Sequence, residues 1–378
     1  MGYKTIDNFN LKGKRVLLRV DINSPVFNGK VFLSNRIKVA VRTIAELKKR
    51  KVRVVVIAHQ GRLGDSDFTS LKQHANLISK FTKIKFVNDI MGEKAISEIK
   101  KLKNGEAILL ENVRFLKEEF EPSKNKLVVR FSKLFDFYIN DAFSVCHRDQ
   151  TSVTRFPKFI KALAGPNLIK EVEALKKIRI KRALFILGGS KAEENILLME
   201  GKVLTCGIFG QLCHIAKGFN FGSQNKFLKT KFSILPELKK KIDEIGKNIK
   251  MPLDFALKIK GMRVEIPLEK FPSNYEIYDV GERTVKIYEK EIKQAKFILM
   301  KGTAGYAEEK IFQKGTRKIL KAIANSGAFS ILAGGHLSEA LSKLGISESK
   351  FNYVSLSGGA LVAYLSGKKL PGLEALKK

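Results

Sequence analysis

Short apolar runs alternate with amphipathic stretches along the whole chain. The apolar runs are rich in Val, Ile, Leu and Phe, and most are continuous, as in strands buried on both faces of a parallel sheet. We predict strands at Arg15–Val20, Arg53–Ala58, Ala107–Leu110, Phe137–Asn140, Ala183–Leu187, Lys202–Cys206, Phe297–Met300 and Phe329–Leu332.

Helical patterns lie between these runs. In Arg36–Arg50 the apolar residues, among them Ile37, Val41 and Ile44, fall on one helical face. A second helix is predicted over Glu237–Gly246, because a proline precedes it and a glycine ends it. Alternating strands and helices predict an α/β fold with a mostly parallel sheet.

A chain of 378 residues has room for two domains. Because no low-complexity linker divides it, the best candidate for a joint is the helical pattern at 167–178, after Ala164-Gly165-Pro166. Each half is long enough to bury its own core. We therefore predict an N-terminal domain over 1–166, a joining helix over 167–178 and a C-terminal domain over 179–360.

The charge of the chain is strongly positive. Seventy-one Lys and Arg stand against 37 Asp and Glu, which gives a net charge of +34. Such a charge attracts phosphorylated metabolites, nucleic acids and acidic lipids. No apolar run approaches the roughly 20 residues of a membrane span, and the start of the chain lacks the apolar core of a signal peptide. The three cysteines show no paired spacing, so we expect a soluble protein of a reducing compartment, the cytoplasm.

Three common motifs are absent from the sequence: the P-loop, the dinucleotide fingerprint G-x-G-x-x-G and the zinc motif H-E-x-x-H. In the first half, Arg36, Arg62, Arg114 and Arg148 are instead candidates to converge at the carboxyl ends of strands, where open α/β sheets bind ligands. A single arginine in so basic a chain would be assigned to the surface. Four of them in this pattern predict a site for a polyanion, because guanidinium groups bind phosphate and carboxylate in pairs of hydrogen bonds.

The second half has glycines at the corresponding strand ends. Gly188-Gly189-Ser190-Lys191 follows a strand and precedes a helix, where backbone amides and a lysine can meet a phosphate. Single glycine pairs usually mark tight turns, but this pattern recurs at Gly302, at Gly334-Gly335 and at Gly358-Gly359. Repetition predicts a lobe whose backbone approaches a nucleotide closely. Together the two halves predict phosphoryl transfer between two anions held across a cleft.

With these motifs in place, the chain resembles phosphoglycerate kinases over its full length, in a form similar to the archaeal members. The resemblance rests on stretches that occur in the family's order and spacing: Arg19-Val20-Asp21-Ile22-Asn23, His59-Gln60-Gly61-Arg62, Glu111-Asn112-Val113-Arg114-Phe115, Asn140-Asp141-Ala142-Phe143 with His147-Arg148, Gly188-Gly189-Ser190-Lys191, Pro252-Leu253-Asp254-Phe255, and Gly367-Lys368-Lys369-Leu370-Pro371-Gly372.

The resemblance implies two Rossmann-like domains joined by a hinge helix, with a C-terminal tail over 361–378 that returns to the N-terminal domain. It implies reversible phosphoryl transfer between 1,3-bisphosphoglycerate with ADP and 3-phosphoglycerate with ATP, in glycolysis and gluconeogenesis. Mg²⁺ would accompany the nucleotide, and the protein would be a monomer. No general base is needed, because the acceptor carboxylate is already ionised, so catalysis consists of positioning and charge stabilisation.

The resemblance also implies roles for individual residues. Arg36 would lie at the transferring phosphoryl group and act in catalysis together with Lys191, and no metal ligand is assigned. The implied 3-phosphoglycerate site comprises Asp21, Asn23, Arg36, His59, Arg62, Arg114 and Arg148, of which the last four hold the distal phosphate. The implied nucleotide site comprises Gly189 and Lys191 at the phosphates, Gly207 and Gly281 at the adenine, Glu308 at the ribose, and the loop Gly334, Gly335 and His336.

The departures from the family pattern lie on the nucleotide side. A second lysine that often follows the phosphate loop is Asn195 here, and the family's Asn-Gly-Pro is Lys301-Gly302-Thr303. His336 stands where many members have a metal-contacting aspartate, and Cys206 stands where glycine is usual. Two alternatives stay open: a family fold that has lost its activity, and a nucleic-acid-binding protein. The even spread of lysines disfavours a nucleic-acid-binding protein. Steep salt dependence of RNA or DNA binding would favour it.

Overall fold

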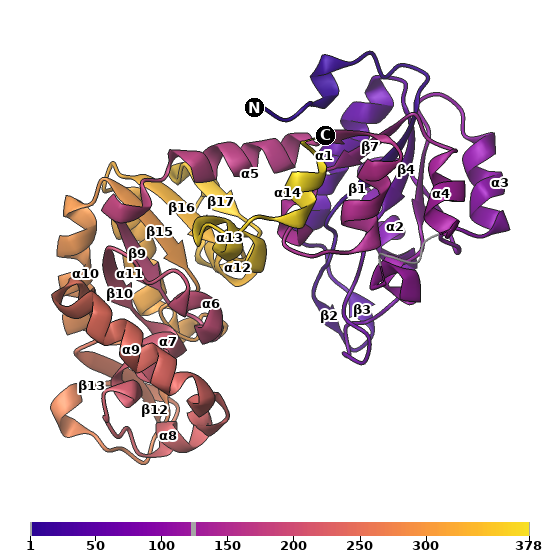
Figure 1. Cartoon of the computed structure of the whole chain (residues 1–378). Helices are drawn as coiled ribbons and strands as arrows, with labels where there is room; N and C mark the ends of the chain where they lie inside the picture. The colour runs from indigo at the N-terminus through magenta and orange to yellow at the C-terminus, as the bar shows by residue number, and fades with distance from the viewer. Residues whose placement is uncertain (1, 122–125, 378) are drawn as a thin grey trace. The chain divides into compact units, whose positions relative to one another are not determined.

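The computed structural model describes residues 2–121 and 126–377, which form two compact units (Figure 1). The first unit contains the chain up to Glu173 and again from Lys368 onward, and the second unit contains Ala174–Gly367. Residues 361–367, which the sequence analysis assigned to the returning tail, therefore lie in the second unit. No helix among the described residues is long and apolar enough to cross a membrane.

The first unit is built on a six-stranded parallel sheet of order β5-β6-β4-β1-β7-β8. In its centre, Leu17 lies opposite Val55 on one side and Tyr138 on the other. Alternate strand residues pack with apolar residues of α1 and α2 in one buried core, so these helices cover one face. The strands are β1 Arg15–Arg19, β4 Arg53–Ile57, β5 Lys85–Val87, β6 Ala107–Leu110, β7 Phe137–Asn140 and β8 Lys161–Ala164, with a hairpin of β2 Val26–Phe27 and β3 Lys30–Val31; the helices are α1 Asn35–Lys49, α2 Lys72–Ser79, α3 Glu93–Lys101, α4 Lys126–Ser132 and α14 Pro371–Ala375.

The second unit contains a six-stranded parallel sheet of order β11-β10-β9-β15-β16-β17 and a smaller antiparallel sheet of order β13-β12-β14. The strands are β9 Ala183–Leu187, β10 Lys202–Thr205, β11 Ile249–Lys250, β12 Asp254–Ile259, β13 Met262–Pro267, β14 Ile277–Val280, β15 Phe297–Lys301, β16 Phe329–Ala333 and β17 Tyr353–Ser355. The helices are α6 Ala192–Ile196, α7 Gly207–Ala216, α8 Ser223–Leu228, α9 Leu235–Ile245, α10 Glu282–Gln294, α11 Lys314–Ala324, α12 Gly335–Leu344 and α13 Gly359–Leu365.

The predicted α/β class with parallel sheets is confirmed. Each predicted strand is present within one residue at its ends, because these runs are central strands buried on both faces. The helix predicted from Glu237 begins two residues earlier, at Leu235, since a proline is tolerated in the first helical turn. The antiparallel sheet was not predicted.

The helix predicted at 167–178 is α5, Pro166–Lys177. The buried Asp141 carboxylate, which follows β7, accepts hydrogen bonds from the backbone N–H of Asn167 (2.8 Å), its Nδ2 (2.6 Å) and Thr43 Oγ1 (2.6 Å). A Cβ on Gly165 would collide with this carboxylate. These contacts fix the start of α5 to the first unit, and the unit boundary falls inside the helix, between Glu173 and Ala174.

The last described residues pack on the segment Thr151–Arg155 of the first unit through α14. The N–H of Gly372 donates to the carbonyl of Cys146 (2.9 Å), and a Cβ on Gly372 would lie 2.7 Å from Val153 Cγ1. Leu373 in α14 is buried. The glycine of the tail motif is thus required by close packing.

Candidate functional site

A buried arginine at the carboxyl edge of the first sheet fixes the orientation of a histidine. Arg19, the last residue of β1, is fully buried, and its Nη2 lies 3.1 Å from Nδ1 of His59. Its Nε donates to Ser152 Oγ (3.0 Å). Because a guanidinium can only donate, His59 Nδ1 accepts, and the proton of the neutral imidazole lies on Nε2. The sequence analysis missed this role of Arg19.

The charge state of His59 follows from its surroundings. Burial lowers the pKa of His59 well below its ordinary value of 6.5, and the nearby charges of Arg19, Arg148 and Arg36 lower it further. The imidazole is therefore a neutral donor in the ligand-free protein at pH 7.

Arg36, in the first turn of α1, is positioned by two of the predicted residues. Its Nε lies 3.2 Å from Asp21 Oδ2, and its Nη1 donates to the carbonyl of Asn23 (3.1 Å). Asp21 is itself held, because Oδ2 accepts from Ser144 Oγ (2.6 Å) and Oδ1 accepts from the N–H of Asn23 (3.0 Å). The guanidinium is thus fixed before any ligand binds.

Arg114 is tied to the turn that precedes Arg62. The buried Arg114 donates to the carbonyl of Gly61, while the N–H of Gly61 donates to Asn23 Oδ1 (2.8 Å). Gly61 has a φ of +65°, and a Cβ there would lie 2.5 Å from the backbone of Asp67, so only glycine fits. The fixed turn places Arg62, which is exposed, next in the chain.

Several arginines at this edge lie within electrostatic range of one another. Burial lowers the pKa of the half-buried Arg148, and the charges of Arg19 and Arg62 lower it further, with Asp21 opposing them. We call these residues the basic cluster; its members are Arg19, Arg36, His59, Arg62, Arg114 and Arg148. Like charges held this close favour the binding of a polyanion. The structure therefore brings together all of the residues predicted for the substrate site of the first unit.

In the second unit, several glycines allow loops to pack on one another. The N–H of Gly189 donates to the carbonyl of Thr303 (2.9 Å), and the N–H of Gly207 donates to that of Ala304 (2.9 Å). A Cβ on Gly188 would collide with the carbonyl of Thr303, and one on Gly302 would collide with that of Gly188. Close packing of the loops thus requires these glycines, a role that the sequence did not predict.

Other glycines of this edge do face open space. Nothing lies within 4 Å of a Cβ placed on Gly334, and on Gly358 it would meet only Glu194 Oε2, at 3.6 Å. Lys191, which precedes α6, is exposed, with its Nζ 3.7 Å from Glu194 Oε1. These residues leave room for a ligand beside Lys191.

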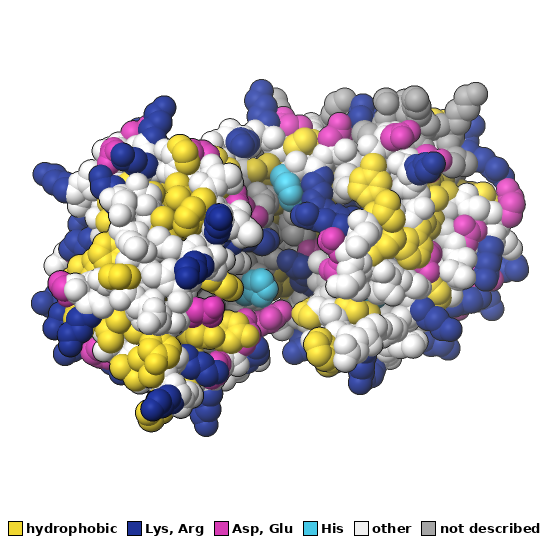
Figure 2. All heavy atoms as spheres, turned by 90° about the horizontal axis from the view of Figure 1, so that it is seen from below, with side chains coloured by type: hydrophobic (Ala, Val, Ile, Leu, Met, Phe, Trp, Pro, Cys, Tyr) yellow, Lys and Arg dark blue, Asp and Glu magenta, His cyan; other side chains and the backbone are white. Residues whose placement is uncertain are grey.

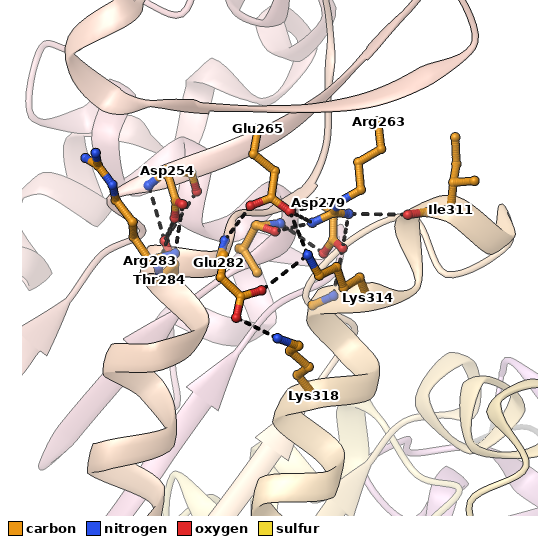
Figure 3. A network of polar contacts seen from close by, with 12 residues as sticks. Asp254, Arg263, Glu265, Asp279, Glu282, Arg283, Thr284, Ile311, Lys314 and Lys318 are labelled. Carbon is orange, nitrogen blue, oxygen red and sulfur yellow. Dashed lines mark hydrogen bonds and ion pairs between the residues drawn. The ribbon is translucent and has the colours of Figure 1, made fainter.

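Five residues predicted for the nucleotide site are not linked to the Gly188–Lys191 loop by the contacts described above: Gly281, Glu308, Gly334, Gly335 and His336. Glu308 is exposed, and His336 is exposed in the first turn of α12. Gly281 precedes α10, and a Cβ there would collide with the buried Asp254 carboxylate, which accepts from the N–H groups of Arg283 (2.9 Å) and Thr284 (2.8 Å). The glycine at 281 is thus explained by this buried contact (Figure 3).

A network of ion pairs joins the antiparallel sheet to α10 and α11 (Figure 3). Arg263 Nη1 of β13 lies 2.7 Å from the buried Asp279 Oδ2 of β14, which also accepts from the N–H of Gly315 (2.8 Å). Lys318 of α11 donates to Glu282 of α10 (2.6 Å). Each of these carboxylates has a cationic partner, so the network is structural.

Candidate metal ligands are not clustered in the part of the chain that the structure describes. Among residues 2–121 and 126–377 there is no group of three or more His, Cys, Asp and Glu side chains that could hold a metal ion. Glu194, the carboxylate beside the phosphate loop, faces the ammonium groups of Lys191 and Lys301.

Comparison with known proteins identifies the family of the chain. The phosphoglycerate kinase family model matches residues 6–368. The phosphoglycerate kinase of Methanothermus fervidus is 38% identical over 400 residues, covering 100% of this chain and 97% of its own, and that of Saccharolobus solfataricus is 39% identical over 395 residues, covering 98% and 96%.

Two solved structures have the same fold. The crystal structure of the phosphoglycerate kinase from Pyrococcus horikoshii superimposes with a TM-score of 0.93 at 34% identity, covering 99% of this chain and 98% of that one. The phosphoglycerate kinase of Coxiella burnetii gives 0.79 at 32% identity, covering 100% and 99%. The chain therefore belongs to the phosphoglycerate kinase family.

Proposed function

We propose that the basic cluster of the first unit binds 3-phosphoglycerate and that the loop edge of the second unit binds ATP or ADP. As a member of its family, the chain transfers a phosphoryl group between 1,3-bisphosphoglycerate with ADP and 3-phosphoglycerate with ATP. The observation that supports the assignment of the substrate is the convergence of five arginines and His59 at one edge of the sheet, where Asp21 faces Arg36 and the buried Glu119 faces Arg19. A ligand with a phosphate and a carboxylate matches this excess of positive charge.

The members of the basic cluster have two different roles in this proposal. Arg62, Arg114 and Arg148, together with the Nε2–H of His59, would hold the distal phosphate of 3-phosphoglycerate. Arg36, fixed by Asp21, would face the carboxylate and the phosphoryl group that it receives. The acceptor oxygen is already ionised at pH 7, so the reaction needs no general base.

Phosphoryl transfer itself moves no proton in this assignment. A carboxylate oxygen of 3-phosphoglycerate forms a bond to the γ-phosphorus, and the bond from that phosphorus to the bridging oxygen of ADP breaks. Arg36 and Lys191 would stabilise the negative charge on the transferring group, which is where fixed charges lower the barrier. The nucleotide would enter with Mg²⁺ on its phosphates, with Gly189 beside the phosphates, Gly207 and Gly281 near the adenine, Glu308 near the ribose, and Gly334, Gly335 and His336 in the adjoining loop.

We further propose that residues 167–178 act as a hinge, because α5 begins in one unit and ends in the other. We assign the protein to the cytoplasm as a monomer; its three cysteines are buried free thiols, which supports a reducing compartment. Nucleic acid is a less suitable partner. Lysines and arginines are scattered over the face shown in Figure 2 and do not form one stripe.

A coupled assay with ATP, Mg²⁺ and 3-phosphoglycerate tests the proposal. Turnover by the folded protein is expected, together with saturation by 3-phosphoglycerate. Absence of turnover would favour a fold that has lost its activity. Binding to RNA or DNA that weakens steeply with salt would favour the nucleic-acid alternative, because release of counterions gives such a slope.

A further inference from the structure

Two positions that depart from the family pattern contact each other. Lys301, the last residue of β15, is only 5% exposed, and its Nζ donates to Asn195 Oδ1 at 2.9 Å. Asn195 in α6 is fully buried, and its Nδ2 donates to the carbonyl of Gly188 at 2.8 Å. The ammonium group of Lys301 is thus connected through one amide to the Gly188–Lys191 loop.

The same ammonium group shares a carboxylate with Lys191. Lys301 Nζ lies 3.1 Å from Glu194 Oε2, and Lys191 Nζ lies 3.7 Å from Glu194 Oε1. The Glu194 side chain is 27% exposed, with its Oε2 atom buried, and a Cβ on Gly358, after β17, would lie 3.6 Å from that atom. An anion thus already occupies a position between two lysines and a glycine.

Burying the ammonium group of a lysine costs free energy of folding, so a buried lysine usually makes an interaction that a neutral side chain could not make. Burial lowers the pKa of Lys301, and the carboxylate of Glu194 opposes this effect. A methionine of similar length would fill the same space without the cost of burying an ammonium group. The charge of Lys301 therefore needs an explanation other than packing.

We propose that Lys301 supplies the second ammonium group of the nucleotide-phosphate site and that Glu194 is its counterion until a phosphate takes that position. Residue types are exchanged between the two positions. In the family pattern implied by the resemblance, position 195 is often lysine and position 301 is asparagine, whereas this chain has Asn195 and Lys301. Because the two side chains are within hydrogen-bonding distance, the exchange moves the ammonium group from α6 to β15 and keeps it at the same loop.

This assignment rests on the proposed function and makes Lys301 a catalytic residue beside Lys191. Its charge would act on the phosphates of the nucleotide, where negative charge is concentrated in the transition state. Asn195 then becomes the positioning residue, since it holds Lys301 and the carbonyl of Gly188 together. The departures at 195 and 301 compensate each other and do not remove activity.

The test compares Lys301→Met, Lys301→Asn and the exchange variant Asn195→Lys/Lys301→Asn with the wild type. Removal of the charge should lower kcat by about 10²-fold, as for the loss of one fixed donor at a reacting group, and should weaken ADP binding measured by calorimetry. The exchange variant should regain at least tenfold in kcat over Lys301→Asn. Lys296→Met, an exposed lysine just before β15, is the matched control and should leave both values unchanged.

If the folded Lys301→Met variant keeps kcat and ADP affinity within twofold of the wild type, Lys301 has only a structural role and the proposal is overturned. If that variant does not fold, the exchange variant decides: a folded exchange variant without turnover overturns the proposal, and one with turnover supports it. Absence of turnover in the wild type would overturn the proposed function instead. ADP binding by wild type and Lys301→Met would still test the lysine.

Discussion

Arg19 Nη2 and His59 Nδ1 lie 3.1 Å apart at the carboxyl ends of the neighbouring strands β1 and β4. The arginine donates, so the histidine must keep its Nδ1 lone pair free and carry its proton on Nε2. A buried cation thereby fixes the tautomer of a histidine that we propose as a substrate-binding side chain.

The first prediction concerns the protonation of His59 in the ligand-free protein. Burial and the charge of Arg19 both lower its pKa from 6.5, so the imidazole should stay neutral throughout pH 6–8. Nitrogen-15 NMR of labelled histidine should show the Nε2–H tautomer without titration in this range, with the signal assigned by its loss in His59→Asn. A titration midpoint between pH 6 and 7 would disprove the prediction.

The second prediction separates binding from catalysis in the basic cluster. Arg148→Ala should raise the KM for 3-phosphoglycerate by roughly 10-fold or more, because a charge-assisted contact made in both ground and transition states is lost. Arg36→Ala should mainly lower kcat, by about 10²-fold, because its contact matters most in the transition state. Steady-state kinetics with both substrates varied give the two constants. If both variants change KM alone, the division of roles is wrong.

The third prediction concerns Asp141, which holds the start of α5. Burial raises its pKa from 3.8 to about 6, so between about pH 4 and pH 6 the folded protein retains a proton that the unfolded chain has lost. The contribution of this group to stability is therefore greatest below pH 4 and falls as pH rises to 6.

Asp141→Asn should remove that part of the pH dependence. It should also destabilise the protein at pH 7 by about 1–3 kcal/mol, because an amide nitrogen cannot accept the bonds from Thr43 or Asn167. Thermal unfolding followed by circular dichroism at pH 4.5, 5.5 and 7 measures both effects. Asp65→Asn, at an exposed aspartate of the same unit, is the control. Equal pH dependence in the two variants would refute the assignment.

The fourth prediction tests whether loop packing requires glycine in the second unit. In Gly188→Ala the new Cβ would collide with the carbonyl of Thr303 and lie 2.7 Å from Cys206 Sγ. We expect a loss of about 1–3 kcal/mol in stability, as for an overpacked core. Gly358→Ala places its Cβ 3.6 Å from Glu194 Oε2 and should unfold at nearly the wild-type temperature. Similar melting temperatures for the two variants would contradict this account.

The fifth prediction concerns the proposed hinge. Phosphoryl transfer needs reacting atoms roughly 3–3.5 Å apart, and the two substrates are assigned to separate units. Binding of both should therefore draw the units together. Small-angle scattering should give a smaller radius of gyration with 3-phosphoglycerate and a non-hydrolysable ATP analogue together than with either alone. An unchanged radius would argue against closure.

The sequence predicts the central strands because a run such as Val54–Ile57 is apolar on both faces. It does not reveal the sheet of β12, β13 and β14, whose outer strand β13 is only partly buried and carries Arg263 and Glu265. A charged residue does not by itself indicate a strand, because its ion-pair partner is not known from the sequence. The partner of Arg263 is Asp279, which lies 16 residues away.

The placement of the candidate site residues could be predicted where these residues belong to local motifs. Arg62 and Arg114 follow strands, and that position alone brings them to one edge. Arg19 is instead the last residue of β1 and is fully buried, and its partners Ser152 and His59 come from distant segments of the chain. The contact between Asn195 and Lys301 spans 106 residues, and each departure considered alone gave no sign that the other offsets it.

The return of α14 to the first unit has a consequence for synthesis of the chain. On the ribosome, Ala174–Gly367 is made before Lys368 and the residues that follow it, so every residue of the second unit exists before the first unit has all of its own. The first unit, although its sheet is made earlier, lacks the N–H of Gly372 that binds Cys146 until this segment has been made. The order of synthesis and the order of completion are therefore reversed for the two units.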